Sequence, residues 1–162
     1  MTTINRVRRV DKAGCEFHVG QGGPESSSEI KKMYDGFARL AISQGLPPAE
    51  KDTRDRWVEK LLEFGRNFLA WVDGNAVGHA AIIPDFERSD GEYVIFVSEP
   101  FRNRGLGAAL TEMAIDDSRS IGLKRLWLTV EAFNFRAIRL YRNAGFAAVD
   151  RGETEITMIL RL

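Results

Sequence analysis

The chain has 162 residues, of which 44% are hydrophobic and 28% are charged, proportions that fit an ordinary globular protein of one domain. Lysine plus arginine and aspartate plus glutamate are balanced at 23 each, which argues against a nucleic-acid partner attracted by bulk charge. The N-terminus has no apolar signal segment and no apolar run approaches the ~18 residues of a membrane span, so we expect a cytoplasmic protein without a membrane partner. The single cysteine, Cys15, cannot form an internal disulfide, which fits a reducing compartment.

Residues 1–14 show no clear periodicity, and we expect them to be weakly ordered or peripheral to a single domain spanning 1–162. The expected elements are, in chain order, a strand at 15–19, a helix from Ser26 past Ala41 with a Ser26–Glu29 capping box, a helix at 53–64, strands at 68–72 and 76–83 joined by a turn at 73–75, a strand at 92–97, a helix from 106 to near 122, a strand at 125–130, a helix from Asn134 to about 144, and two strands within 146–162. This order predicts an α/β domain with a mixed sheet. Long strand-helix alternation is missing, so a doubly wound parallel sheet is not expected.

The segment Arg102-Asn103-Arg104-Gly105-Leu106-Gly107 joins the expected strand at 92–97 to the start of a helix. A helix N-terminus has unpaired N–H groups and partial positive charge, so it attracts anions. The two glycines allow the backbone to approach a bulky anion, and the two arginines supply charged donors. The segment lacks the Gly-Lys-Ser/Thr ending of a P-loop and the third glycine of a dinucleotide fingerprint. These residues alone leave both an anion site and a plain tight turn open.

A second segment, VEAFNFRAIRLYRNAGF at residues 130–146, follows the strand expected at 125–130. Together the two segments resemble the GNAT superfamily, the general-control-related N-acetyltransferases. In that family R/Q-x-x-G-x-G/A follows the fourth strand, and N-x-x-A-x-x-x-Y-x-x-x-G-F follows the fifth. The resemblance covers about residues 76–149. It implies a central, mostly antiparallel sheet flanked by helices, in which the parallel fourth and fifth strands splay apart.

The resemblance also implies acetyl-CoA as cosubstrate, with no metal, bound in the gap between the splayed strands. The residues implied in its binding are Phe96 and Val97, whose backbone groups would pair with pantetheine, Arg102 and the segment Arg104, Gly105, Leu106, Gly107 and Ala108, which would take the pyrophosphate, and Asn134, which would contact the pantetheine arm. A β-bulge in the fourth strand would free an amide for the thioester carbonyl.

Tyr141 matches the family's frequent general acid, although a tyrosine there could also serve only to pack the helix on the sheet. The proton acceptor is left open by the sequence. A family glutamate on the fifth strand is replaced by Thr129, and Glu131, two residues on, is our candidate for base or amine contact. Glu92 and His79 are weaker candidates, and His79 is more simply a hydrogen-bonded core histidine.

These observations predict an N-acetyltransferase that transfers an acetyl group from acetyl-CoA to a primary amine of a small molecule or protein. The amine would attack directly in a ternary complex, and the resemblance makes a homodimer a reasonable expectation. The alternative is a non-catalytic acyl-CoA-binding regulatory module of the same fold. The sequence does not identify the acceptor. An acidic group formed by Asp85, Glu87, Asp90 and Glu92 could attract a cationic amine or simply be a solvated loop.

Overall fold

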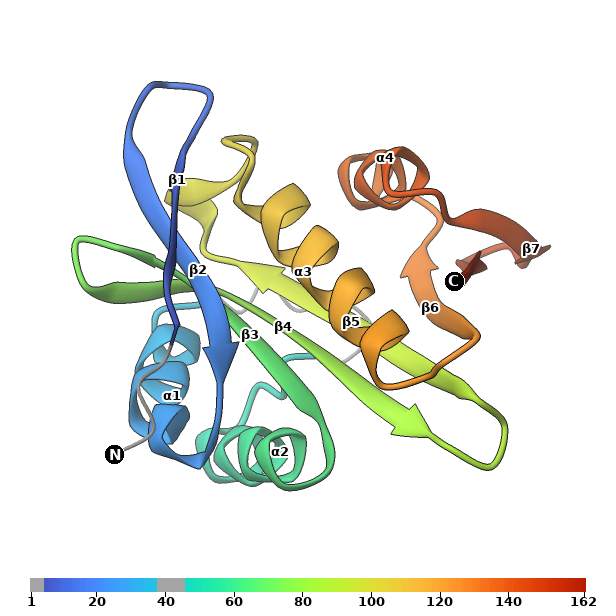
Figure 1. Ribbon diagram of the computed structural model, residues 1–162, viewed down its shortest axis with the longest axis horizontal. Helices are drawn as coiled ribbons and strands as arrows, with labels where there is room; N and C mark the ends of the chain where they lie inside the picture. Colours follow the sequence, from blue (N-terminus) through green and yellow to red (C-terminus); the bar gives the residue numbers. More distant parts are fainter. Residues whose placement is uncertain (1–4, 38–45) are drawn as a thin grey trace.

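A computed structural model describes residues 5–37 and 46–162, which form a single sheet with helices on both faces (Figure 1). The sheet has eight strands in the order β1-β2-β3-β4-β5-β6-β8-β7. The elements are β1 (Val7–Val10), β2 (Glu16–Gly22), η1 (Pro24–Ser26), α1 (Ser27–Asp35), α2 (Lys51–Phe64), β3 (Arg66–Val72), β4 (Asn75–Asp85), β5 (Asp90–Val97), η3 (Glu99–Phe101), α3 (Leu106–Ser120), β6 (Arg125–Glu131), α4 (Phe135–Asn143), β7 (Ala147–Arg151) and β8 (Glu155–Arg161). The predicted mixed α/β class is therefore confirmed.

Neighbouring strands are antiparallel except β5 and β6, which correspond to the expected fourth and fifth strands. These two pair in parallel through Asp90–Arg125, Gly91–Leu126 and Glu92–Trp127. Beyond Trp127, β6 is paired with β8 on its other side but no longer with β5. The strands diverge in Figure 1, so the predicted splay is present and begins at Glu92.

The pairing of β4 with β5 shows no bulge, which corrects the bulge expected in this strand. The register is continuous from Gly78–Val97 to Asp85–Asp90, and Ser98 N–H extends it by donating to Val77 O at 2.8 Å. Backbone polar groups alternate in direction along a strand, so those of Phe96 face β4. The groups that face the gap are those of Ile95 and Val97, in place of the expected pair Phe96 and Val97.

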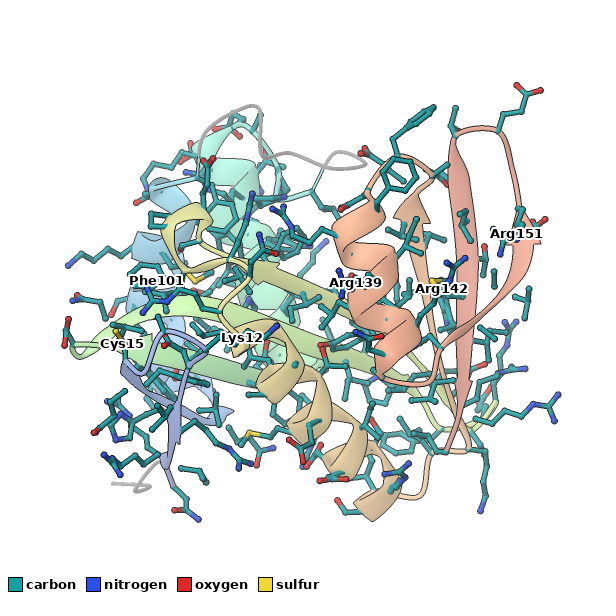
Figure 2. All side chains as sticks on the ribbon, turned by 90° about the horizontal axis from the view of Figure 1, so that it is seen from above. Lys12, Cys15, Phe101, Arg139, Arg142 and Arg151 are labelled. Carbon is teal, nitrogen blue, oxygen red and sulfur yellow. The ribbon has the colours of Figure 1, made fainter. Side chains whose placement is uncertain are left out.

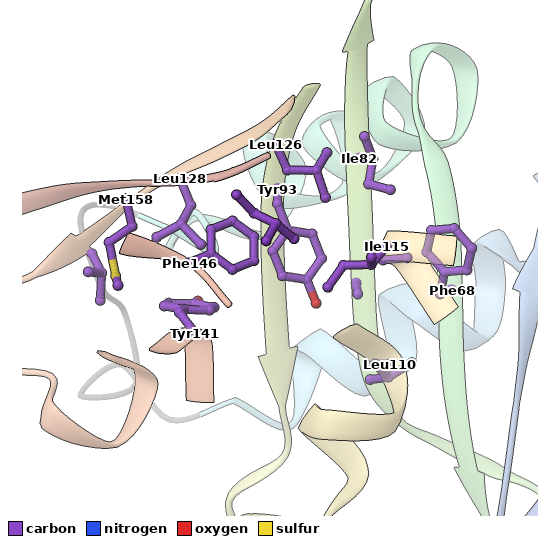
Figure 3. Close-up of a cluster of buried hydrophobic side chains, with 14 of the residues drawn as sticks. Phe68, Ile82, Tyr93, Leu110, Ile115, Leu126, Leu128, Tyr141, Phe146 and Met158 are labelled. Atoms are coloured by element: carbon purple, nitrogen blue, oxygen red, sulfur yellow. The ribbon is translucent and has the colours of Figure 1, made fainter. Parts of the chain in front are cut away.

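Two clusters of buried side chains lie on opposite faces of the sheet, because side chains alternate along each strand. The larger cluster packs under α3 and α4, and Figure 3 shows Tyr93, Leu126 and Leu128 meeting Tyr141 and Phe146 within it. The smaller cluster packs under α1 and α2, and its members are Ile30, Met33, Tyr34, Val58, Leu62, Leu69 and Trp71. Figure 2 shows α1 and α2 on one side of the sheet and α3 on the other.

Three local predictions differ from the structure. Residues 7–10, expected to hold little structure, form the exposed edge strand β1. Helix α1 ends at Asp35, while Leu40 and Ala41, which we expected in it, lie outside the described residues. The Ser26–Glu29 capping box is absent: Ser26 makes no side-chain cap, and the Glu29 carboxylate instead accepts the indole N–H of Trp71 at 2.8 Å.

The other local signals are confirmed. Asp73 and Gly74 have positive φ values of 49° and 77°, as a tight β3–β4 hairpin turn requires. Asn134 caps α4 by accepting the N–H of Ala137 at 3.2 Å, and Gly145 follows the helix with a φ of 103°. Within the described ranges, no helix is long and apolar enough to cross a membrane.

Candidate functional site

The start of α3 has no side-chain cap among the described residues and no acidic residue in its first turn. Its N-cap is Gly105, which has left-handed backbone angles (φ 101°, ψ −2°) and therefore a conformation that favours glycine. The first hydrogen bond, from Ala109 N–H to Gly105 O at 3.1 Å, leaves the N–H groups of residues 106–108 without a helical acceptor. Among the described α-helices, α3 alone has neither a side-chain cap nor an acidic residue in its first turn.

The change from a left-handed Gly105 to a right-handed helical Leu106 turns consecutive N–H groups toward one point, an arrangement that binds anions. Leu106 is 1% exposed and anchors this turn in the core. At Gly107, an added Cβ would lie 3.3 Å from Leu140 Cδ2 on α4 and 3.9 Å from Ile95 Cδ1 on β5. We call the backbone of residues 105–108 at the start of α3 the anion cradle. This cradle lies where α3 meets α4 and β5.

Arg102 stands between this cradle and the gap. Its Nε donates to the Val97 carbonyl at 2.9 Å, which agrees with the Val97 backbone facing away from β4. The pKa of Arg102 is lowered by burial and then by the charge of Arg136 on α4, with Glu99 acting in the opposite sense. Two guanidinium groups that repel each other beside an uncapped helix start create a region that an anion would stabilise.

The Arg104 side chain was predicted to bind phosphate, but its guanidinium binds a carboxylate of the protein. Its Nε and Nη2 contact the Asp11 carboxylate at 2.6 and 2.5 Å, and its guanidinium lies 5.3 Å from the centre of the Phe101 ring. The charged edge of Arg104 is thus occupied by a carboxylate of the chain itself. Its contribution to the cradle comes through the backbone.

Tyr141 lies on the α3/α4 face of the sheet and is 7% exposed. Its ring contacts Phe146 and Tyr93, with centroids 5.9 and 6.4 Å away (Figure 3). Burial raises the pKa of Tyr141 to about 12, so the phenol keeps its proton at neutral pH. The side chain therefore packs α4 on the sheet and keeps its proton at neutral pH, while its role as general acid stays a prediction.

The opposite face of the splayed strands carries the candidate proton acceptors. Leu126, Leu128 and Val130 are buried under α3 and α4, so Thr129 and Glu131 point to the α1/α2 face. Glu92 points to that same face, because its neighbour Tyr93 belongs to the α3/α4 core. Glu92 and Glu131, on different strands, therefore lie on one side of the sheet.

An open cavity of about 580 Å³ lies on this face beside the β4–β5 turn, and Glu92 and Trp127, the last pair before β5 and β6 separate, are among its lining residues. Its lining includes Trp127 and Phe86 together with Asp85, Glu87, Asp90 and Glu92, the acidic group recognised in the sequence. Arg88 pairs with Asp85 at 3.7 Å, and Arg125 pairs with Asp90 at 2.6 Å. Burial raises the pKa of Glu92, which brings its titration closer to neutrality.

His79 belongs to the core, as its simpler interpretation predicted. The Asn67 amide donates to Leu61 O at 2.7 Å, so its carbonyl oxygen accepts the His79 Nε2–H at 2.8 Å. His79 Nδ1 must then accept the Tyr34 hydroxyl hydrogen, also at 2.8 Å. Burial lowers the pKa of His79 to about 3, so the ring is neutral and unsuited to catalytic proton transfer near pH 7.

Comparison with known proteins identifies the family. Residues 30–146, well over half of the chain, match the model of the acetyltransferase (GNAT) family. The chain belongs to the GNAT acetyltransferase family. The matched range includes the gap, the α3 cradle and all of α4, and so contains every residue that the sequence predicted for the site.

Several relatives of this GNAT chain are named acetyltransferases. The mycothiol acetyltransferase of Beutenbergia cavernae is 44% identical over 103 residues, which cover 61% of this chain and 34% of the relative. The mycothiol acetyltransferase of Geodermatophilus obscurus is 34% identical over 145 residues, 85% of this chain and 46% of the relative. The ribosomal protein bS18-alanine N-acetyltransferase of Salmonella typhimurium is 46% identical over 52 residues, 32% of this chain and 35% of the relative. The chain thus spans less than half the length of these relatives.

Solved structures agree on the fold. The GNAT domain of S. lividans PAT superposes with a TM-score of 0.82 at 15% identity, covering 97% of both chains. The Salmonella typhimurium protein yncA with its cofactor acetyl-CoA gives a TM-score of 0.72 at 21% identity, covering 90% of this chain and 94% of that one. The predicted sheet architecture is thereby confirmed, and the superfamily resemblance is confirmed by the family match over residues 30–146.

Besides Ile95, two residues at the candidate site were not predicted from the sequence, Arg136 and Asp11. Arg136 reaches the surroundings of Arg102 only because α4 packs beside the start of α3. Asp11 comes from a segment that we expected to be peripheral, and it lies 93 positions before its partner Arg104. No local motif marks either residue, so only the tertiary arrangement reveals them.

Proposed function

We propose that this protein transfers an acetyl group from acetyl-CoA to a primary amine. The observation that carries the proposal is the uncapped start of α3 beside a gap between parallel strands, with a protonated, buried Tyr141 on one face and carboxylates on the other. The relatives described above are named mycothiol acetyltransferases and a ribosomal protein bS18-alanine N-acetyltransferase, and these names share acetyl transfer. A fold neighbour with bound acetyl-CoA supports the choice of donor.

The donor fits the cradle and the gap in two parts. The N–H groups of Arg104, Gly105, Leu106, Gly107 and Ala108 take the pyrophosphate, with Arg102 and Arg136 adding charge. The pantetheine arm lies along β5, where the backbone groups of Ile95 and Val97 face the gap and can pair with its amides as a neighbouring strand would. Phe96 contributes its side chain on the α1/α2 face, and the Asn134 amide borders the arm from α4.

The reaction needs no nucleophile from the protein. The amine nitrogen attacks the thioester carbon, the C–N bond forms and the C–S bond breaks. The nitrogen gives up one proton as it becomes an amide, and the sulfur leaves as a thiolate that takes up one proton, so the transfer step balances. Tyr141 donates a hydrogen bond to that sulfur, and its raised pKa keeps the phenol protonated for this purpose. The attacking ammonium loses one proton first, and this proton goes to a carboxylate on the α1/α2 face.

Glu92 and Glu131 are the two carboxylates in position to accept the proton. Glu92 stands at the point where the strands separate, and burial raises its pKa, which favours it as the base. Glu131 lies further along β6 on the same face, and we assign it contact with the incoming amine.

The cavity beside Glu92 supports a cationic amine as the acceptor. Trp127 and Phe86 supply aromatic surface, to which an ammonium group is attracted. Of the four carboxylates in the lining, Asp85 and Asp90 already pair with arginines, which leaves Glu87 and Glu92 as net negative charge. Small polyamines, amino acids and protein N-termini or lysines all meet this requirement.

Free thiol release tests the proposal directly. The full chain is incubated with acetyl-CoA and a panel of amines, and free CoA thiol is followed together with the mass of each amine. We expect thiol release that depends on the amine and a matching gain of one acetyl group. Tight CoA binding without amine-dependent release would refute catalysis and support the non-catalytic binding module.

A further inference from the structure

The turn between β1 and β2 is bonded to the loop that leads into α3. Lys12 N–H donates to the Arg104 carbonyl at 3.0 Å, and the Asp11 carboxylate binds the Arg104 guanidinium from the same turn. Figure 2 shows Lys12 and Cys15 of this turn on the same side as Phe101 of the α3 loop. A hairpin far from the cradle in sequence is therefore in direct contact with the backbone that forms it.

Asp11 is fully engaged in this contact. Its side chain is 1% exposed, and one carboxylate oxygen accepts two N–H groups of its own turn, from Ala13 at 2.8 Å and from Cys15 at 2.9 Å. The other oxygen accepts both Nε and Nη2 of Arg104. Burial raises the pKa of Asp11, but the hydrogen bonds from Cys15 and Arg104 outweigh it, so the net pKa is lowered and the group stays charged.

Arg104 lies between two residues with left-handed backbone conformation, one of which is not a glycine. Asn103 has a φ of 59° and Gly105 a φ of 101°, and a left-handed non-glycine residue costs on the order of 1 kcal/mol. Such a conformation persists when neighbouring contacts hold it. Asp11 and Lys12 hold Arg104 at both its guanidinium and its carbonyl, and this fixes the direction of the N–H groups that follow.

We infer that Asp11 is a positioning residue for the phosphate cradle: through Arg104 it holds the amides of residues 105–108 in place before the donor binds. The inference rests on the proposed function, since it assigns a role in binding the CoA diphosphate. Asp11 touches neither the donor nor the amine. Its loss therefore weakens donor binding and leaves the rate at saturating donor largely unchanged.

The chain provides a control in a second Arg–Asp pair, which joins β3 to α3 away from the cradle. Arg66 contacts Asp117, near the end of α3, at 2.7 Å through Nε and at 2.5 Å through Nη2. Asp117→Ala removes the same kind of pair at the end of α3 remote from the cradle. A general loss of stability should affect both variants, whereas a change in the cradle should affect Asp11→Ala alone.

The experiment measures the Kd for CoA by calorimetry, and KM and kcat with acetyl-CoA, for the wild-type chain, Asp11→Ala, Asp11→Asn and Asp117→Ala. We expect Asp11→Ala to raise Kd and KM at least tenfold with kcat within about twofold, Asp11→Asn to lie between, and Asp117→Ala to bind like the wild type. Asp11→Asn keeps the shape of the side chain and gives the readout if Asp11→Ala does not fold.

A double-mutant cycle tests whether the effect passes through Arg104. Asp11→Ala combined with Arg104→Ala should bind CoA no more weakly than Arg104→Ala alone. Three results would each overturn the inference. They are wild-type CoA affinity in folded Asp11→Ala and Asp11→Asn, equal losses of CoA affinity in the Asp11 and Asp117 variants, and additive losses of affinity in the double-mutant cycle. If the wild-type chain itself does not bind CoA, the proposed function fails first and this inference with it.

Discussion

Protonation of His79 should set much of the acid sensitivity of this protein. In the folded state its pKa is about 3, against an ordinary value of 6.5, so the unfolded chain binds this proton at a higher pH than the folded chain does. The contribution of neutral His79 to the free energy of unfolding is fully present above pH 6.5 and is lost as the pH falls below 6.5. At about 1.4 kcal/mol per pH unit, the loss is about 2 kcal/mol by about pH 5.

The variant His79→Gln removes this titration while keeping a polar side chain between Tyr34 and Asn67. At about pH 7.5 it should cost about 1–3 kcal/mol, because an amide does not reproduce both hydrogen bonds. The stability difference between wild type and variant should then shrink by about 2 kcal/mol on going to about pH 5. Urea unfolding curves at the two pH values measure this difference, in which all other titrating groups cancel.

His18→Gln is the control, because His18 lies on β2 with a side chain that is 40% exposed. It measures the effect of the same substitution at an exposed position of the sheet. A His79→Gln difference that stays constant between the two pH values would show that the folded state accepts the proton readily, and would refute a neutral His79 held between two hydrogen-bond partners.

Three further predictions concern the site. Tyr141→Phe should lower kcat at least about 100-fold with unchanged CoA affinity, whereas Tyr93→Phe, at a buried tyrosine whose ring packs against Tyr141, should lose stability but not rate. Equal rates for both variants would limit Tyr141 to packing. Glu92→Gln should lower kcat and flatten the acid limb of the pH–rate profile, and because burial disfavours the charged form, the variant should unfold at a higher temperature than wild type above neutral pH. Glu131→Gln should mainly raise the KM for the amine. The reverse pattern would exchange the roles of the two glutamates. Gly107→Ala should be tolerated because its Cβ meets the flexible end of a leucine side chain at 3.3 Å, but Gly107→Val should abolish CoA binding measured by calorimetry, and tight binding by that variant would remove Gly107 from the cradle.

Local patterns predicted most of this fold because their physical causes are local. Alternating apolar residues predicted β4, β5 and β6. Asn134 and Gly145 predicted the cap and the end of α4. The Ser26–Glu29 capping box failed for a non-local reason: Glu29 is held by Trp71, 42 positions away, which competes with the helix start.

The candidate site shows the same difference between features with local causes and features with non-local causes. The glycines and the uncapped start of α3 could be recognised from sequence, because they depend on a few consecutive residues. The identity of the gap-facing amides could not, because it depends on the register that fixes Gly78 opposite Val97. The partner of Arg104 was equally hidden, since charge alone does not distinguish an arginine that meets phosphate from one that meets a buried aspartate.

The continuous register between β4 and β5 limits how this site can change. Inserting or deleting one residue within β5 would exchange its two rows of side chains, moving Glu92 under α3 and Tyr93 under α1, and would turn the amides of Ile95 and Val97 toward β4. Donor binding and acceptor chemistry would be lost together. A redesign of acceptor preference should therefore keep the length of β5 and alter the turn at residues 86–89, where added residues would reshape the cavity wall and leave the strand in register.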